Sequence, residues 1–280
     1  MWGSPVRGLG LNMVRPVRGL GMIEIRNVRK SFGDKVVLQD VSAKMEAGKT
    51  NLIIGTSGSG KTVLMKTMIG LLPVDSGEVL YEGKDITKMN DKELKEIRMQ
   101  IGMLFQGGAL FDSKTVENNV MFPLDMFTNM TYRQKVRRVD EVLARVNLVE
   151  ANRKFPAEIS GGMKKRVALA RAIVQNPKYL FCDEPNSGLD PQTSLVIDKL
   201  VKEITTEYNI TTIINTHDMN TVMESGDHIV YMYNGKKQWE GSNKDIIFSK
   251  DEKLNAFIFA SEFLTKAKEM SMMEAKEQKG

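Results

Sequence analysis

The segment with the clearest chemical signature spans residues 55–62 and reads Gly-Thr-Ser-Gly-Ser-Gly-Lys-Thr. Its spacing, G-x-x-x-x-G-K-[ST], is typical of a loop whose backbone N–H groups wrap phosphates. Glycines are required because a Cβ would obstruct both the close approach and the dihedral angles. Lys61 offers a mobile cation to the β- and γ-phosphates, and the Thr62 hydroxyl is suited to ligate Mg²⁺. We therefore predict a nucleotide site made of Gly55, Thr56, Ser57, Gly58, Ser59, Gly60, Lys61 and Thr62.

Two adjacent acids, Asp183 and Glu184, follow the mostly apolar residues 179–182. Such a run predicts a buried strand, and open α/β sheets bind ligands at the carboxyl ends of their strands. Burying two carboxylates side by side is costly unless a cation or a phosphate is expected there. We assign Asp183 to Mg²⁺, directly or through water, and Glu184 to polarising the water that attacks the γ-phosphate. For either acid alone, capping of a strand end is the alternative.

A scaffold of alternating strands and helices must position these groups, and the sequence from residue 22 onward predicts one. Alternating or short apolar runs predict strands at 23–28, 35–42, 50–54, 79–81, 179–182 and 210–214. Apolar residues at helical spacing predict helices at 63–71, 130–150 and 163–174. This order favours an α/β fold with a largely parallel sheet and a helical insert between its two halves.

The composition is that of an ordinary globular protein, with 280 residues, 41% hydrophobic and 27% charged residues, and a net charge of +5. A single cysteine, Cys182, cannot form an intramolecular disulfide, which favours a reducing compartment over secretion. No apolar run approaches the roughly 20 residues that span a bilayer, so any work at a membrane would go through a partner.

The two ends of the chain differ from the middle. Residues 1–21 carry three arginines, no acid and a repeated Pro-Val-Arg-Gly-Leu-Gly, which predicts a disordered leader; an RNA-binding arm is the alternative. In the C-terminal extension, residues 241–280, one helix is expected from about 251 to 270. Its apolar face contains Leu254, Phe257, Ile258 and Leu264. That face must dock either on its own domain or on a partner subunit, and the sequence leaves both open.

A third motif, Ile-Ser-Gly-Gly-Met at residues 159–163, precedes a helix that contains Ala-Leu-Ala-Arg-Ala at 168–172. Together with the phosphate loop and the Asp-Glu pair, it resembles the nucleotide-binding domain of ABC ATPases over residues 22–240. The resemblance implies a P-loop NTPase fold with a RecA-like, mostly parallel core sheet and an antiparallel β portion. It also implies a helical subdomain at about 107–177, ATP as the nucleotide and Mg²⁺ as the metal.

The same resemblance gives roles to further residues. Phe32 is expected to stack on adenine, although on sequence alone it could be any core aromatic. Gln106 is expected to touch Mg²⁺ and to sense the transporter. Asp190 closes the D-loop, Asn-Ser-Gly-Leu-Asp, and His217 is the switch histidine that would donate to the γ-phosphate and orient the water. A lone histidine is more often structural, and we keep that interpretation for His228.

A second anion site is expected where Ser160, Gly161 and Gly162 begin a helix. This site needs a γ-phosphate from elsewhere, because one chain carries one phosphate loop and one such signature. We therefore expect a head-to-tail homodimer that shares two ATP molecules at its interface.

Departures from the usual family pattern point to a subfamily. The signature ends in Met163 and begins with Ile159, and the D-loop begins with Asn186. With Leu-Phe-Gln-Gly-Gly-Ala-Leu-Phe-Asp at 104–112 and Asn-Val-Met-Phe-Pro-Leu at 119–124, the chain resembles the ATPase subunit of Mce-type transporters, which maintain lipid asymmetry. The alternative is that these apolar residues merely cover the helical insert.

The subfamily resemblance implies a motor that moves phospholipids and lies peripherally on the cytoplasmic side of the bacterial inner membrane. Its implied partners are transmembrane permease subunits, an Mce-domain lipid-binding protein and, as a further candidate, a small cytoplasmic accessory subunit. A small-solute transporter is the first alternative. A soluble ABC ATPase acting on nucleic acid or the ribosome is disfavoured by the nearly neutral core, so no nucleic acid partner is expected. A decayed, non-enzymatic subunit is disfavoured because every motif residue is present.

Overall fold

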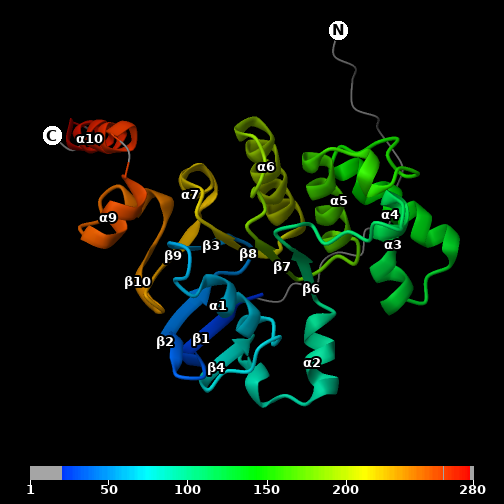
Figure 1. Cartoon of the computed structure of the whole chain (residues 1–280), viewed down its shortest axis with the longest axis horizontal. Coiled ribbons are helices and arrows are strands. Elements are labelled where there is room, and N and C mark those ends of the chain that lie inside the picture. Colours follow the sequence, from blue (N-terminus) through cyan, green and yellow to red (C-terminus); the bar gives the residue numbers. More distant parts are fainter. Residues whose placement is uncertain (1–20, 261, 278–280) are drawn as a thin grey trace, which may run out of the picture.

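A computed structural model describes residues 21–260 and 262–277 of the chain, which form two sheets with helices between and around them (Figure 1). The antiparallel sheet has the order β2-β1-β4-β5. Its strands are β1 (Ile23–Phe32), β2 (Lys35–Met45), β4 (Ser76–Tyr81) and β5 (Lys84–Asp85). The six-stranded sheet has the order β10-β9-β3-β8-β7-β6. Its strands are β3 (Thr50–Ile54), β6 (Ile101–Leu104), β7 (Tyr179–Asp183), β8 (Thr211–Thr216), β9 (His228–Tyr233) and β10 (Lys236–Gly241).

The register of the six-stranded sheet brings three strand ends to one edge. Every pairing from β9 through β3, β8 and β7 to β6 is parallel, and β10 alone pairs antiparallel. Asp183 lies opposite Asn215, and Ile54 lies opposite Thr216. The phosphate loop, the two acids and His217 therefore all follow strands that end side by side. The predicted mostly parallel core sheet with an antiparallel β portion is confirmed.

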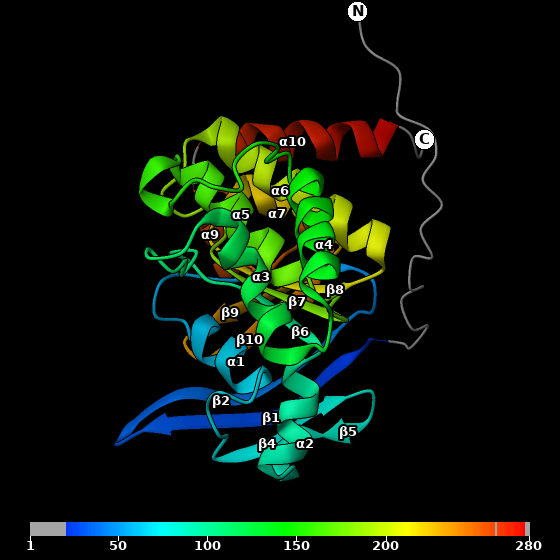
Figure 2. The ribbon, with the colours of Figure 1, turned by 90° about the vertical axis from the view of Figure 1, so that its right-hand side faces the viewer.

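Helices cover both faces of the larger sheet (Figures 1 and 2). Helix α1 (Lys61–Met68) lies between the two sheets, and the connection from β6 to β7 forms the helical insert. The insert contains α3 (Val116–Phe127), α4 (Tyr132–Arg145) and α5 (Gly161–Ile173). The remaining helices are α2 (Asp91–Arg98), α6 (Pro191–Tyr208), α7 (Met219–Ser225), α8 (Asn243–Ile246), α9 (Glu252–Ile258) and α10 (Glu262–Glu277), with 3-10 turns at Ile86–Lys88 and Pro156–Glu158.

The core divides in two because alternate residues of a strand face opposite sides of a sheet. On β3, Ile53 packs with α1 and the antiparallel sheet, whereas Leu52 and Ile54 pack with the helical insert and α6. On β7, Phe181 faces α1 and the antiparallel sheet, and Cys182 faces the helical insert and α6. Continuous burial on both faces explains why these strands read as unbroken apolar runs.

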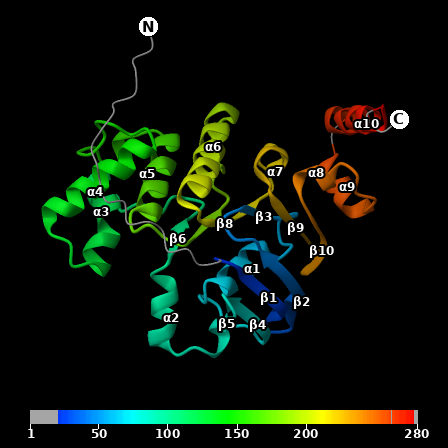
Figure 3. The same ribbon diagram turned by 180° about the vertical axis from the view of Figure 1, so that it is seen from behind.

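The C-terminal extension differs from the prediction of one helix. The chain leaves helical geometry at Phe259, so α9 and α10 are separate helices. The break follows from packing, because Leu254 and Ile258 are fully buried in the core of their own domain while α10 runs on beyond it (Figure 3). Helix α9 therefore docks on its own domain.

The predicted leader, residues 1–21, lies outside the described residues except for Gly21. None of the helices in the described part of the chain combines the length and the apolar character that crossing a membrane requires.

Candidate nucleotide site

The phosphate loop connects the buried strand β3 to α1, as its motif requires. Gly55 has φ +149°, and a Cβ there would lie 2.3 Å from the carbonyl oxygen of Met232 on β9, so only glycine fits. Thr56, Ser57, Gly58 and Thr62 are exposed, whereas Ser59, Gly60 and Lys61 are buried. The loop thus offers backbone to solvent at its tip and a hydroxyl at the start of α1.

Lys61 is folded into the loop that it belongs to. Its ammonium donates to the carbonyl oxygens of Gly55 at 2.8 Å and Thr56 at 3.0 Å. Burial lowers the pKa of Lys61, and the opposing charges of Glu184 and Asp183 partly offset that effect. The ammonium is therefore partly desolvated and close to both acids, where a polyphosphate would be a stronger partner than two carbonyls.

The two acids are held by β8, the neighbouring strand. The Asn215 side chain donates from Nδ2 to Oδ1 of Asp183 at 3.1 Å, and its backbone carbonyl accepts from the Glu184 N–H at 3.0 Å. Glu184 itself has φ +47°, a left-handed conformation that a non-glycine residue adopts at a cost. One residue of β8 thus orients the Asp183 carboxylate and fixes the Glu184 backbone, and the strand runs one residue beyond the predicted 179–182, to Asp183.

Two side chains from distant parts of the chain meet the Glu184 carboxylate. Gln106 donates from Nε2 to Oε2 of Glu184 at 3.2 Å and to Oγ of Ser187 at 3.1 Å. The Nδ1 atom of His217 lies 3.2 Å from Oε1 of Glu184, which leaves Nε2 for another partner. Gln106 and His217 are exposed, so this cluster faces solvent and is open to a ligand.

The signature turn lies beside the D-loop. Ser160 is the N-cap of α5, and its Oγ accepts from the Met163 N–H at 3.3 Å. A Cβ on Gly162 would lie 2.5 Å from Cγ2 of Thr193, the residue that Asp190 caps at the start of α6. Within the described residues, neither Ser160 nor Asp190 hydrogen-bonds to the phosphate loop. Ser160 and Asp190 therefore lie apart from the phosphate loop, although the D-loop reaches Gln106 through Ser187.

Buried polar residues support the D-loop from behind. Asn186 donates from Nδ2 to Oδ1 of Asp198 at 2.8 Å and to Oγ1 of Thr221 at 3.0 Å, and the Thr221 hydroxyl donates to Oδ2 of Asp198 at 2.7 Å. Burial raises the pKa of Asp198 to about 6, although both hydrogen bonds act in the opposite direction. This network joins the D-loop to α7, which follows His217.

The donors predicted for Mg²⁺ are oxygen atoms, which fits that ion. Only three such donors are predicted, the hydroxyl of the exposed Thr62, the Asp183 carboxylate and the Gln106 amide. Within the described residues, no group of three acidic, histidine or cysteine side chains could hold a metal by itself. Mg²⁺ commonly takes one or two protein ligands together with phosphate and water, so the residues present fit it.

Phe32 ends β1 with 48% of its surface exposed, and the Lys30 ammonium lies 5.5 Å from the ring centroid. It is not a core aromatic, so the alternative interpretation of this residue is wrong. His228 is buried with its ring nitrogens facing Asn51 and Glu240, which agrees with a structural role.

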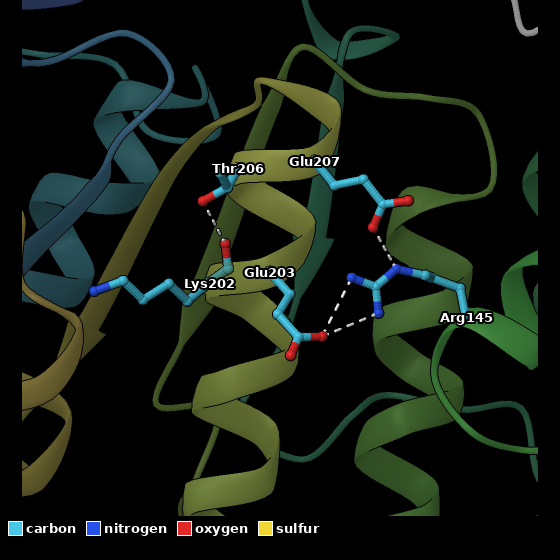
Figure 4. A pocket seen from close by; sticks show the side chains of 5 residues that line it. All are labelled: Arg145, Lys202, Glu203, Thr206 and Glu207. Atoms are coloured by element: carbon cyan, nitrogen blue, oxygen red, sulfur yellow. Dashed lines mark hydrogen bonds and ion pairs between the residues drawn. The ribbon is translucent and has the colours of Figure 1, made fainter. Parts of the chain in front are cut away.

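A surface depression between α4 and α6 is a weaker candidate for function. Arg145 spans it, with Nε 2.7 Å from Oε2 of Glu207 and Nη1 3.3 Å from Oε2 of Glu203 (Figure 4). Arg145 pairs with both glutamates, and the Lys202 ammonium points away from them and lies 3.9 Å from Asp227, so the charged side chains at this depression already have partners.

Sequence reasoning missed three supporting residues: Asn215, Ser187 and Lys165. Asn215 had a signal, since a polar side chain directly after the predicted buried strand at 210–214 demands a partner if the strand extends over it. Ser187 and Lys165 carried no such signal, because their contacts cross between elements far apart in sequence.

A family model described as ABC transporter matches residues 38–187. The chain is 43% identical to the methionine import ATP-binding protein MetN of Carboxydothermus hydrogenoformans over 76% of its own length and 63% of that protein. It is 39% identical to the probable ribonucleotide transport ATP-binding protein mkl of Mycobacterium tuberculosis H37Rv over 80% of its own length and 62% of that protein. The chain therefore spans just under two thirds of these relatives.

Solved structures agree with the fold. One is the ATP-binding cassette MJ0796 in a dimeric post-hydrolysis state bound to ADP and Pi, with a TM-score of 0.72 and 30% identity over 79% of this chain and 98% of that chain. Another is cbiO1 from Clostridium perfringens, part of the ABC transporter complex cbiONQ, with a TM-score of 0.76 and 31% identity over 83% of this chain and 94% of that one.

Proposed function

Because the chain belongs to the ABC transporter family of ATPases, we propose that it is the ATP-hydrolysing motor subunit of a membrane transporter. The observation that carries this proposal is the convergence of Gln106 and His217 on the Glu184 carboxylate, next to the desolvated Lys61. We assign residues 22–240 to the ATPase domain, with its helical subdomain at about 107–177.

In this mechanism Glu184 accepts a proton from water as the water oxygen attacks the γ-phosphorus. The bond from that phosphorus to the bridging oxygen breaks, which gives ADP and phosphate. Lys61 and the backbone N–H groups of residues 55–62 hold the polyphosphate, and Nε2 of His217 faces the γ-phosphate while Nδ1 stays near Glu184. Mg²⁺, held by Thr62, Gln106 and Asp183, would neutralise phosphate charge when bound.

A second copy of the chain would complete the site. Ser160, Gly161 and Gly162 lie at the N-terminus of a long helix, where backbone N–H groups favour an anion. Since no hydrogen bond joins them to their own phosphate loop in the described residues, we propose that they bind the γ-phosphate held by the partner copy, with Asp190 at the interface. The dimeric state of the MJ0796 cassette supports this arrangement.

The surface that would meet a permease is next to the loop at residues 105–111 that contains Gln106, here called the Q-loop. Phe105 and Phe111 are exposed, and the Phe111 ring packs 4.8 Å from that of Phe122. The buried Asn119 side chain accepts from the Phe111 N–H and donates to its carbonyl, so the backbone that carries the ring is fixed. A rigid, half-exposed aromatic suits docking against a partner, because little conformational freedom is lost on binding.

We further propose that the cargo is a phospholipid and that the permease works with an Mce-domain protein, on the cytoplasmic side of the bacterial inner membrane. The motifs at 104–112, 119–124 and 160–163 support this subfamily. Small-solute transport is the second candidate, because the relatives named above include a methionine import protein.

Steady-state ATPase activity of the purified chain tests the motor assignment. We expect Glu184→Gln to lower turnover by about 100-fold or more while ATP binding is retained, and to give an ATP-dependent dimer on size-exclusion chromatography. Glu96→Gln, an exposed carboxylate on α2, is the matched control. Turnover of Glu184→Gln at the wild-type rate would overturn the assignment of the base.

Purification from native membranes tests the cargo. Recovery of a permease with an Mce-domain protein, and ATPase stimulation by the lipid-loaded complex, would support lipid transport. Recovery of a solute-binding protein with stimulation by methionine would support the second candidate instead.

A further inference from the structure

Lys165 is a buried cation that the proposed mechanism does not use. It lies on α5 with only 6% of its surface exposed, and its ammonium donates to the backbone carbonyl of Gln106. Burial lowers the pKa of Lys165, with weaker opposite effects from Cys182 and Glu184. Burying a charged group costs free energy unless it is well paired, so this contact holds the ammonium in place.

A second cation of α5 holds the same loop. Arg171 donates from Nη2 to the Gly108 carbonyl at 2.6 Å and from Nη1 to the Ala109 carbonyl at 2.7 Å. Both loop residues have positive φ, +75° at Gly108 and +47° at Ala109. The loop from 106 to 109 is therefore attached to α5 through three carbonyl oxygens.

The attached loop carries the side chain that meets the proposed base. The Gln106 backbone is bound by Lys165, and the Gln106 amide donates to Glu184 and Ser187. Helix α5 is continuous from Gly161 to Ile173, and Ser160 caps its first turn. A chain of direct contacts thus runs from the signature turn through Lys165 and Gln106 to Glu184.

We propose that Lys165 is a positioning residue that fixes Gln106 to α5 and so sets where the Gln106 amide meets Glu184. The proposal rests on the proposed function for its kinetic consequence. When the signature turn engages the nucleotide held by a partner copy, the displacement of α5 passes through Lys165 to Gln106. Lys165 touches no substrate, so it acts on the reaction through Gln106 alone.

Hydrogen exchange on the nucleotide-free chain is the test that does not depend on hydrolysis. In Lys165→Met, which keeps an apolar stem but removes the ammonium, we expect amides in residues 105–111 to exchange about tenfold faster or more, while those of α5 stay protected. Lys165→Arg should restore wild-type protection because it keeps a donor. Lys164→Met, a neighbouring and less buried cation, is the control.

The kinetic readout is the split between kcat and KM. We expect Lys165→Met to lower kcat about tenfold while KM for ATP changes less than about twofold, and Lys165→Arg to recover most of the loss. Lys165→Gln loses the ammonium, and its shorter stem withdraws the remaining amide donor from the Gln106 carbonyl, so it should give the same results and replaces Lys165→Met if that variant does not fold.

Unchanged exchange at 105–111 in Lys165→Met, or equal loosening of the loop and α5, would overturn the proposal. If the wild-type chain hydrolysed no ATP, the proposed function would fail. The hydrogen-exchange result would still show whether Lys165 attaches the loop at 105–111 to α5.

Discussion

The side-chain amide of Asn215 donates to Oδ1 of Asp183 over 3.1 Å, from a position where Asn215 is fully buried. The other amide atom, Oδ1 of Asn215, is buried without a hydrogen-bond partner among the described residues. An unpaired buried carbonyl oxygen lowers the free energy of unfolding. Asn215 therefore orients Asp183 at a cost in stability.

Replacement of Asn215 by valine therefore separates activity from stability. We expect Asn215→Val to raise the Mg²⁺ concentration needed for half-maximal ATPase activity about tenfold, because the carboxylate loses its lateral donor. The melting temperature should stay equal or rise, since the unpaired oxygen is removed. Ile214→Val, on the same strand, is the control, and an unchanged Mg²⁺ requirement in Asn215→Val would contradict the assigned role.

We expect Lys61 to contribute mainly to ATP binding. We expect Lys61→Ala to weaken ATP binding about tenfold or more, because a charge-assisted contact to phosphate is lost. Lys66→Ala, an exposed lysine on the same helix, should bind ATP like the wild type. Titration with a fluorescent ATP analogue measures both, and wild-type affinity in Lys61→Ala would show that the loop binds without its cation.

The buried Asp198 should make stability depend on pH. Its pKa in the folded chain, about 6, lies above the ordinary value of 3.8, so the folded state holds the proton more tightly between those values. Its contribution therefore becomes more favourable as pH falls from 7 towards 4, by about 2 kcal/mol. Urea unfolding of wild type and Asp198→Asn at several pH values measures this, and parallel pH profiles would contradict it.

The Glu240 carboxylate should make the folded chain less stable as the pH falls, which is opposite to the effect of Asp198. The hydrogen bond from His228, helped by Lys237, lowers the pKa of Glu240 to about 2, from an ordinary value of 4.5. The resulting stability is present above pH 4.5 and is lost as pH falls towards 2. Because the side chain is partly exposed, we expect Glu240→Gln to cost about 1 kcal/mol at pH 7 and nothing at pH 2. An equal cost at both pH values, from urea midpoints, would rule out this linkage.

Local sequence predicted the strands next to the site well. Residues 50–54 and 179–182 match β3 and β7 because strands buried on both faces require unbroken apolar runs. The predicted helix at 130–150 proved shorter, since α4 starts at the Thr131 cap and ends at Arg145. The C-terminal helix was predicted as one because its apolar spacing continues, whereas burial of Ile258 against the core ends α9 there.

Composition and spacing along the chain were enough to determine the phosphate loop, the acidic pair and the α/β order, because each depends on neighbouring residues or on one strand. Contacts between distant segments required the folded chain. Residues 106, 165, 184, 187, 215 and 217 come from four separate segments, and only the parallel register of β7 and β8 and the packing of α5 against the Q-loop bring them together. Distances across a sheet are set by strand order and register, which no local pattern encodes.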